Sequence, residues 1–166
     1  MMMVRLELPD DVASIHAVHA VSFPTPGEAR LVDHLRAAGR LSVSLVADEG
    51  GAVVGHVAFS PATTMRGPTG AGLAPVAVVE GYRRQGIAAA LVRAGLEVCR
   101  EAGFGWVVVL GEPAYYGRFG FRPAPTFGLS DEYGGGPAFQ AIELIPGTLP
   151  VGAGLVRYAP EFALLG

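Results

Sequence analysis

The amino-acid sequence predicts one α+β domain over residues 1–166, built on a mixed β-sheet. Residues 73–79 form an apolar run, which a glycine-bearing turn, an amphipathic period over residues 86–102 and a second apolar run at 106–110 follow. This is the order of a parallel βαβ crossover. Residues 41–47 and 52–60 are β-type runs on either side of Asp-Glu-Gly-Gly, which predicts an antiparallel hairpin.

The N-terminal elements follow from periodicity and capping patterns. Residues 4–8 alternate apolar and charged side chains, as a first strand does. Asp10 is expected to cap a helix with an apolar face over residues 12–18. Residues 25–28, Thr-Pro-Gly-Glu, have the pattern of a capping box with proline at the first helical position, and Gly39 is expected to end this second helix.

The second half of the chain predicts shorter elements. Residues 61–71 form a loop, and Pro75 within the strand that follows predicts a bulge or a splayed region, because proline cannot donate to the ladder. Residues 111–121 predict a short helix that ends at a glycine turn. Two late β-type runs, 139–144 and 154–158, are expected to form a closing hairpin.

Composition and charge exclude several classes of protein. Hydrophobic residues make up 51% of the chain and charged residues 16%, which excludes a disordered chain. No apolar stretch approaches the ~20 residues that span a bilayer, so a soluble protein is expected. The net charge of −3 argues against bulk nucleic-acid binding, which needs a basic face to neutralise phosphates.

Cysteine, histidine and the N-terminal residues narrow the choice further. Acidic residues at positions 7, 10 and 11 come before a signal-peptide core can form, so a cytoplasmic protein is expected. The single cysteine, Cys99, excludes an internal disulfide, and its place late in the long helix favours packing over an acyl-carrying role. The four histidines have no convincing metal-ligand spacing, and no metal is expected: His16, His19, His34 and His56.

The turn at residues 81–86, Gly-Tyr-Arg-Arg-Gln-Gly, suits an anion site at the start of a helix. N–H groups there have no partner within the helix and carry the positive end of its dipole, so a phosphate satisfies both. Arg83 and Arg84 add charge, while Gly86 and Ala88 are small enough to let a ligand approach the backbone. The turn lacks the endings of a P-loop and of a dinucleotide fingerprint. The alternative is a solvated basic turn.

Three segments together resemble the GNAT (GCN5-related) N-acetyltransferase family. Arg83, Gly86 and Ala88 match its Arg/Gln-x-x-Gly-x-Gly/Ala turn, and residues 75–78, Pro-Val-Ala-Val, are similar to its acyl-CoA strand. Residues 116–121, Tyr-Gly-Arg-Phe-Gly-Phe, resemble its Tyr-x-x-x-Gly-Phe segment. Residues 55–61 and 108–123 are similar to the YhbS-like bacterial branch of that family. The resemblance covers nearly the whole chain and implies a mixed, mostly antiparallel sheet of about six to seven strands with flanking helices.

The resemblance implies acetyl-CoA as co-substrate and a primary amine as acceptor, with the acetyl group transferred directly. Pantetheine would bind along backbone groups of Val76 and Val78, with a bulge amide near Ala77 polarising the thioester carbonyl. The pyrophosphate would be held by the turn and the helix start: Arg83, Arg84, Gln85, Gly86, Ile87 and Ala88. The acceptor site would involve the first two helices and the loops 61–71 and 122–138.

Tyr116 falls on the tyrosine of the family segment and is the expected general acid, since a phenol with a pKa near ~10 protonates a thiolate at neutral pH. Tyr115 competes with it to face the sulfur and is otherwise assigned to acetyl-CoA binding. The base stays open. Glu28 is either a carboxylate for the cationic amine or a helix cap, and His56, Glu112 or a chain of waters are further options.

Two rivals remain beside the enzyme. The first is a catalytically silent acyl-CoA-binding module, with the same turn and no productive acceptor site. The second is an interaction domain that has kept only the fold. A homodimer is plausible from the family, although no segment of the sequence identifies an interface.

Overall fold

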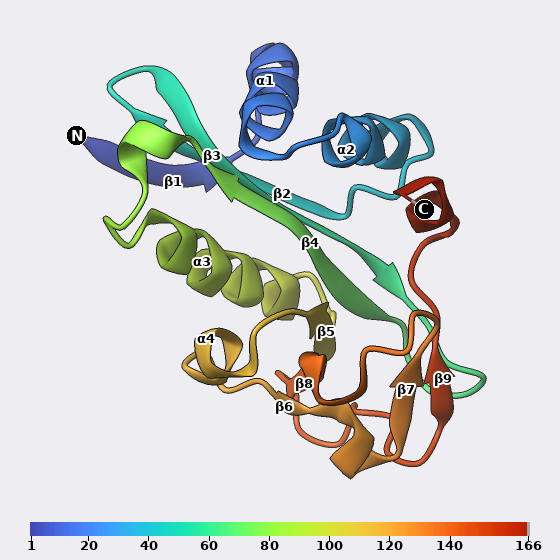
Figure 1. Ribbon diagram of the computed structural model, residues 1–166. Coiled ribbons are helices and arrows are strands. Elements are labelled where there is room, and N and C mark those ends of the chain that lie inside the picture. The colour runs from blue at the N-terminus through green and yellow to red at the C-terminus, as the bar shows by residue number, and fades with distance from the viewer. Residues whose placement is uncertain (166) are drawn as a thin grey trace. The chain divides into compact units, whose positions relative to one another are not determined.

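The computed structural model describes residues 1–165 (Figure 1). Among these residues, five short 3₁₀ turns accompany the longer elements: Pro9–Asp11, Glu80–Tyr82, Ala124–Phe127, Gly136–Ala138 and Pro160–Leu165. In chain order the helices and strands are β1 (Met2–Leu6), α1 (Val12–Ser22), α2 (Gly27–Ala37), β2 (Val43–Glu49), β3 (Ala52–Ala62), β4 (Gly70–Val78), α3 (Ile87–Glu101), β5 (Trp106–Leu110), α4 (Pro113–Gly117), β6 (Arg122–Pro123), β7 (Leu129–Asp131), β8 (Phe139–Glu143) and β9 (Gly154–Val156).

Within residues 1–165, seven strands form one mixed sheet in the order β1-β2-β3-β4-β5-β8-β6. The pairings β1–β2, β2–β3, β5–β8 and β6–β8 are antiparallel, and β4–β5 is parallel. The predicted α+β class and the mostly antiparallel sheet are confirmed. Strands β7 and β9 form a separate, parallel two-stranded sheet.

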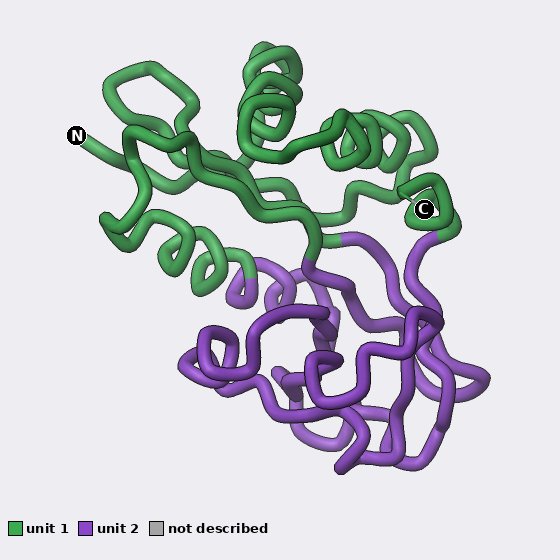
Figure 2. The backbone as a smooth tube through the Cα atoms, viewed as in Figure 1, with its two compact units in different colours: residues 1–59, 74–95, 160–166 green, residues 60–73, 96–159 purple. Residues whose placement is uncertain are grey.

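The chain forms two compact units (Figure 2). The strands β3 and β4 and the helix α3 each have residues in both units. Unit 1 comprises residues 1–59, 74–95 and 160–166, and unit 2 comprises residues 60–73 and 96–159. That residues 1–166 act as one domain stays a prediction.

In unit 1, α1 and α2 lie against one face of the strands, and the start of α3 lies against the other (Figure 1). A cluster of fully buried side chains, Ile15, Val32, Val46 and Ala58, joins both helices to β2 and β3. Helical positions three or four residues apart share a face, and alternate strand positions share another, so the apolar residues meet there. The predicted helices and the β2–β3 hairpin are confirmed.

In unit 2, β5 is buried between two neighbours. It pairs in parallel with β4 at Ala71 and Gly72, before Pro75, and antiparallel with all five residues of β8. Trp106 is fully buried, and its ring occupies the space beside Gly70, where a Cβ would lie 2.3 Å from the indole. The indole Nε1–H donates to the Pro68 carbonyl at 3.0 Å, so the one polar atom of this side chain is satisfied.

Three sequence expectations about elements are wrong. The first strand is two residues earlier than predicted, at Met2–Leu6. The predicted closing hairpin does not form, because β8 pairs with β5 and β6 while β9 pairs with β7. Asp10 does not cap α1: the N-cap is Asp11, whose carboxylate instead accepts from Leu8 N and from Arg5. Periodicity identifies a strand, but its partner is decided by tertiary packing.

Candidate functional site

The basic turn lies at the start of α3 in unit 1, as its sequence predicts. Residues 83–86 are exposed, and α3 begins at Ile87. The Gly86 carbonyl accepts from Ala90 N at 3.0 Å and starts the helical ladder, which leaves the N–H groups of the first turn without helical partners. The turn therefore presents donors and the positive helix end on an exposed surface.

Two backbone conformations shape this turn. Arg84 has a φ of +64° and Gly86 a φ of +78°. A Cβ on Gly86 would meet nothing within 4 Å. Glycine is therefore needed here for its left-handed conformation, and not because a side chain would clash. Arg84 adopts the same region with a full side chain, a strained conformation of the kind that clusters at functional sites.

Arg83 connects the turn to β4, because its Nε–H donates to the Val78 carbonyl at 2.8 Å. Its side chain therefore positions the turn. Along β4, Ala77 and Val78 are buried at 7% exposure each, and Val76 is half-buried. On the neighbouring strand, a Cβ on Gly55 would lie 3.2 Å from the Ala77 carbonyl oxygen. The backbone here is closely surrounded.

Tyr115 and Tyr116 lie on α4 in unit 2. Gly111 lets the Tyr116 ring rest on its backbone, since a Cβ there would lie 2.4 Å from the ring. The two tyrosine rings meet edge to face at 5.0 Å, and the Arg118 guanidinium lies 4.6 Å from the centre of the Tyr115 ring. Tyr115 therefore has a cation above its ring, whereas Tyr116 packs edge to face on Phe121 at 5.8 Å.

Burial, followed by the nearby Tyr115, raises the pKa of Tyr116 to about 12. The phenol is therefore protonated at neutral pH and has a proton to give. Burial also raises the pKa of Cys99 to about 12. A fully buried thiol of this kind is a packing residue, because the thiolate is the nucleophilic form.

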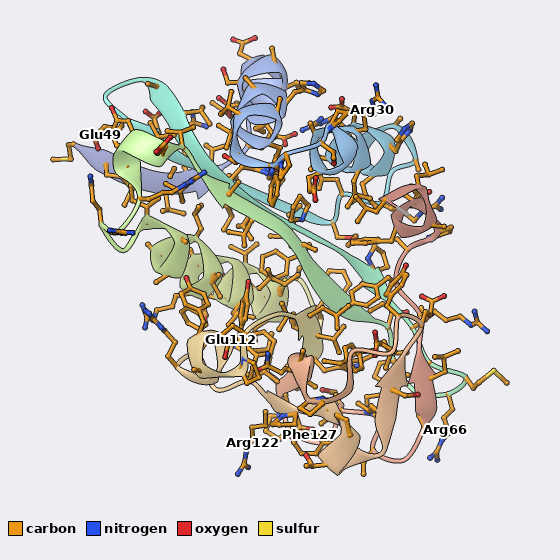
Figure 3. All side chains as sticks on the ribbon, viewed as in Figure 1. Arg30, Glu49, Arg66, Glu112, Arg122 and Phe127 are labelled. Atoms are coloured by element: carbon orange, nitrogen blue, oxygen red, sulfur yellow. The ribbon has the colours of Figure 1, made fainter. Side chains whose placement is uncertain are left out.

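The structure gives different surroundings to the three side-chain candidates for the base, Glu112, Glu28 and His56. Glu112 is the N-cap of α4 and accepts from Ala114 N at 3.3 Å (Figure 3). Glu28 does not form the predicted capping box: the N-cap of α2 is Pro26, with no side-chain cap. Within residues 1–165 its Oε1 is buried without a hydrogen-bond partner. Glu28 thus has an acceptor that no structural role uses.

His56 is fully buried, and it is not the isolated core histidine that its strand context suggested. It hydrogen-bonds His19 of α1 and Ser44 of β2, at 2.8 Å in each case. Sequence spacing gives no sign of this cluster, because the partners are 37 and 12 residues away in the chain. The contacts depend on α1 packing across the sheet.

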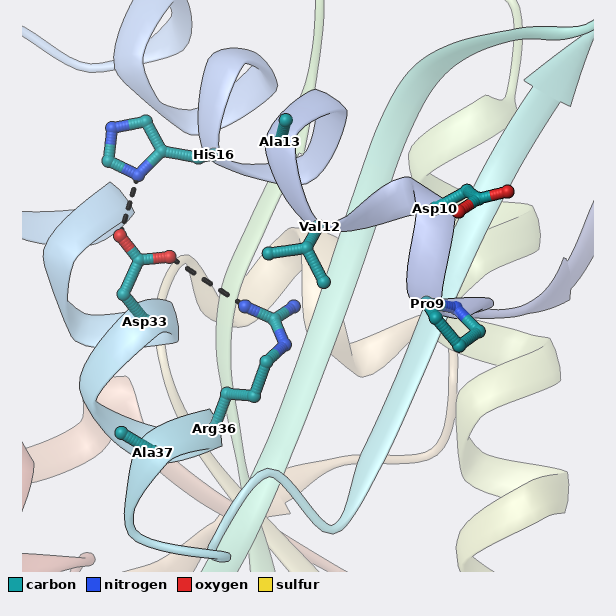
Figure 4. Close-up of a pocket in the computed structure, with 8 residues that line it drawn as sticks. All are labelled: Pro9, Asp10, Val12, Ala13, His16, Asp33, Arg36 and Ala37. Carbon is teal, nitrogen blue, oxygen red and sulfur yellow. Dashed lines mark hydrogen bonds and ion pairs between the residues drawn. The ribbon is translucent and has the colours of Figure 1, made fainter.

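An open groove of about 670 Å³ lies between α1 and α2 in unit 1 (Figure 4). Asp33 of α2 lies between His16 and Arg36 (Figure 4), 2.7 Å from His16 Nδ1 and 3.7 Å from Arg36 Nη1. Its lining residues come from both helices and from the 3₁₀ turn before α1: Pro9, Asp10, Val12, Ala13, His16, Asp33, Arg36 and Ala37. Its charges are largely paired with one another.

Two further searches concern residues 1–165 alone. No cluster of three or more histidine, cysteine, aspartate or glutamate side chains is arranged to hold a metal ion in this part of the chain. None of its helices combines the length and apolarity that crossing a bilayer requires.

Comparison with known proteins agrees with this geometry. Residues 12–121 match the acetyltransferase (GNAT) family. The uncharacterized N-acetyltransferase YhbS of Escherichia coli K12 is 43% identical over 164 residues, which cover 97% of this chain and 98% of the relative. The uncharacterized N-acetyltransferase YjhQ of the same organism is 38% identical over 118 residues, or 68% of this chain and 65% of the relative.

Two solved structures are similar along almost the full length. E. coli YhbS in complex with CoA has a TM-score of 0.92 at 41% identity, covering 98% of this chain and 92% of that one. A GNAT family acetyltransferase from Brucella melitensis in complex with acetyl-CoA has a TM-score of 0.80 at 36% identity, covering 98% of both chains. With its fold, its phosphate-type turn and these relatives in agreement, the chain belongs to the GNAT acetyltransferase family.

Proposed function

We propose that this protein is an N-acetyltransferase that moves the acetyl group of acetyl-CoA directly to a primary amine. The exposed turn at the start of α3 carries the proposal, because its free N–H groups and left-handed residues suit a pyrophosphate. Relatives that share 41% and 36% of the sequence were solved with CoA and acetyl-CoA, which supports the same ligand here.

The binding roles divide between strand and turn. Backbone groups of Val76 and Val78 hold pantetheine, and an amide near Ala77 polarises the thioester carbonyl. Arg83 holds the turn against β4 through Val78. Its neighbours contact the pyrophosphate, largely through N–H groups: Arg84, Gln85, Gly86, Ile87 and Ala88.

The reaction needs three proton movements. The amine nitrogen attacks the acetyl carbonyl carbon, the carbon–sulfur bond breaks, and the departing thiolate takes a proton from the Tyr116 hydroxyl. Before the attack, Glu28 holds the cationic amine through the carboxylate oxygen that has no hydrogen-bond partner among residues 1–165, and the amine loses its first proton to a base. The second proton leaves the nitrogen as the amide forms and restores the Tyr116 hydroxyl. Tyr115 contributes to acetyl-CoA binding.

The test is acetyl-CoA-dependent thiol release with polyamines, amino acids, aminoglycosides and lysine peptides as acceptors. Tyr116→Phe is expected to lower kcat by a factor on the order of 10², with acetyl-CoA affinity unchanged, because only the proton donor is lost. Tyr115→Phe is the comparison variant: it retains kcat, and any loss falls on acetyl-CoA affinity, because Tyr115 is assigned to binding. An unchanged kcat in Tyr116→Phe contradicts the assignment.

The same assay separates the enzyme from a silent acyl-CoA-binding module. Release that depends on one class of amine identifies the acceptor. Acetyl-CoA binding without release above hydrolysis for any amine supports the silent module instead. A cytoplasmic location and a homodimer stay predictions, which fractionation of cells and sedimentation test directly.

A further inference from the structure

Four polar side chains in unit 1 form a continuous hydrogen-bonded chain on the face of the sheet that α1 covers. His19 Nε2 and His56 Nδ1 are 2.8 Å apart, and His56 Nε2 and Ser44 Oγ are 2.8 Å apart. The Ser44 hydroxyl donates to Glu7 Oε1 at 2.5 Å. Ser44 reaches His56 because Val46 is paired with His56 across the ladder, and residues two apart share a face.

The donors and acceptors of this chain can be assigned in order. The Glu7 carboxylate, paired with Arg36 at 2.7 Å, accepts from Ser44, so the Ser44 oxygen is free to accept from His56 Nε2–H. Burial, followed by His19 and Arg36, holds the pKa of His56 well below its usual value, so the ring is neutral and its Nδ1 accepts. His19 must then donate through Nε2–H.

This assignment leaves a bare lone pair on His19 Nδ1. Burial, followed by His16, lowers the pKa of His19 to about 4, so the ring is neutral, and a neutral ring with a proton on Nε2 has none on Nδ1. His19 is fully buried, and Nδ1 has no hydrogen-bond partner among residues 1–165. A buried acceptor without a donor is costly, and a substrate ammonium is a donor that would satisfy it. Because His19 is fully buried, the side chains that cover Nδ1 must move aside when the amine enters.

The chain lies beside the proposed acetyl-CoA strand. The Val79 N–H donates to the Val54 carbonyl at 2.9 Å, and Gly55 faces Val78 on the α3 side of the sheet. This register places His56 opposite Ala77, on the face that α1 covers. His56 is therefore the direct cross-strand neighbour of Ala77, the residue assigned to the thioester.

We propose that His19 Nδ1 is the base that takes the proton of the acceptor amine, and that His56 and Ser44 relay it to Glu7. The proposal rests on the acetyltransferase function above. As Nδ1 gains a proton, the Nε2 proton of His19 moves to His56 Nδ1. The His56 Nε2 proton moves to Ser44, and the Ser44 proton moves to Glu7. The net change is one proton from the amine to the Glu7 carboxylate, and no cation stays buried.

The far end of the relay is partly exposed to solvent. The Glu7 side chain is 19% exposed, and its partner Arg36 lines the groove between α1 and α2 (Figure 4). A proton on Glu7 can therefore exchange with water. The charged and titratable groups that act on the two rings are His16 and Asp33 near His19, and Arg36 and Asp11 near His56.

The kinetic test uses the full chain with acetyl-CoA and two probe amines, spermidine and a lysine peptide. At pH 7, His19→Gln and Ser44→Ala are each expected to lower kcat/KM by a factor on the order of 10². Ser44→Thr keeps a hydroxyl and is expected to retain activity. His34→Gln is the matched control, because His34 is an exposed histidine that is not part of the hydrogen-bonded relay. Acetyl-CoA affinity is expected to stay unchanged in all four.

A pH profile separates a relay from a structural role. The loss is expected to shrink as pH rises toward the amine pKa near ~10, because the amine then needs no base. A loss that is constant across pH, or activity within twofold of wild type in His19→Gln, overturns the proposal.

A second measurement does not depend on turnover. Nitrogen-15 spectra of the histidine side chains are expected to show His19 and His56 both neutral with the proton on Nε2 at pH 7. A proton on His19 Nδ1 overturns the relay. If wild-type protein acetylates no amine, the proposed function falls and takes the catalytic role of the relay with it, and the spectra show whether the hydrogen-bonded chain is nonetheless present.

Discussion

Single residues at the turn before α3 have a conformational role that composition alone does not show. Gly86 and Gly103, which lie before and after α3, both have positive φ, +78° and +94°, and a Cβ on either would meet nothing within 4 Å. They differ in their surroundings, because Gly86 precedes the N–H groups of the first turn and Gly103 follows the last carbonyls.

Gly86→Ala and Gly103→Ala are therefore expected to have the same structural cost and different effects on binding. Each lowers the free energy of unfolding by about 1–2 kcal/mol, because alanine is strained at positive φ. Only Gly86→Ala is expected to weaken acetyl-CoA binding, by about tenfold, as measured by calorimetric titration. Equal affinities in the two variants would remove the turn from the binding site.

Local sequence patterns predicted the roles of single site residues less well than they predicted the elements. Thr-Pro-Gly-Glu is a capping pattern, yet Pro26 is the N-cap, and among residues 1–165 the buried Oε1 of Glu28 has no hydrogen-bond partner. Capping energies are about 1 kcal/mol, so tertiary contacts of comparable size decide where such a side chain goes. His56 illustrates the same limit, since its partners belong to other elements.

Helix α3 is the element in which local propensity and packing disagree most clearly. Gly95 lies inside the helix, where alanine is the better helix former by about 1 kcal/mol. A Cβ at this position would lie 2.3 Å from Phe59 Cε1 on β3, and Phe59 is fully buried. The glycine allows the helix to approach the aromatic ring.

Gly95→Ala is expected to lower the free energy of unfolding by on the order of 1 kcal/mol, because overpacking outweighs the gain in propensity. In a Phe59→Leu background the clash is relieved, and the same substitution is expected to be stabilising. Urea denaturation of the four proteins measures the coupling. A stability gain for Gly95→Ala in the wild-type background would show that the ring moves aside without cost.

The elements themselves were largely predictable. The 3.6-residue period identifies α1, α2 and α3, and the two-residue period with its glycine turn identifies β2 and β3. Pairing over long sequence separation was not predictable: β8 joins β5, whose five-residue register it matches, and the short strands β6 and β7 carry no pattern of their own.

At the scale of the whole molecule, two fully buried neutral histidines connect folding to pH. Burial holds the pKa of His19 at about 4 and that of His56 well below its usual value. In the unfolded chain both have a pKa near ~6.5. The folded state therefore binds fewer protons than the unfolded state below that pH.

The free energy of unfolding is thus expected to be at its full value above pH ~6.5 and to fall as pH decreases toward 4. His19 alone accounts for roughly 3 kcal/mol of this fall. Asp11 and Glu161 have lowered pKa values in the folded state. The stability that each carboxylate contributes is lost only as the pH falls below its ordinary pKa, 3.8 for Asp11 and 4.5 for Glu161. His19→Gln should flatten the slope between pH 6.5 and 4 in denaturation experiments, and an unchanged slope contradicts the assignment of a buried neutral ring.

The sequence by itself determined the α+β class, most of the elements and the resemblance to acetyltransferases that the comparisons confirmed. These depend on side-chain periodicity and on turn motifs, which are properties of neighbouring residues. Only the tertiary structure decided that His19, His56, Ser44 and Glu7 are joined and that Glu28 caps no helix. Hydrogen bonds between residues far apart in the chain arise when helices bury their apolar faces on the sheet, and no local pattern encodes which polar side chains meet there.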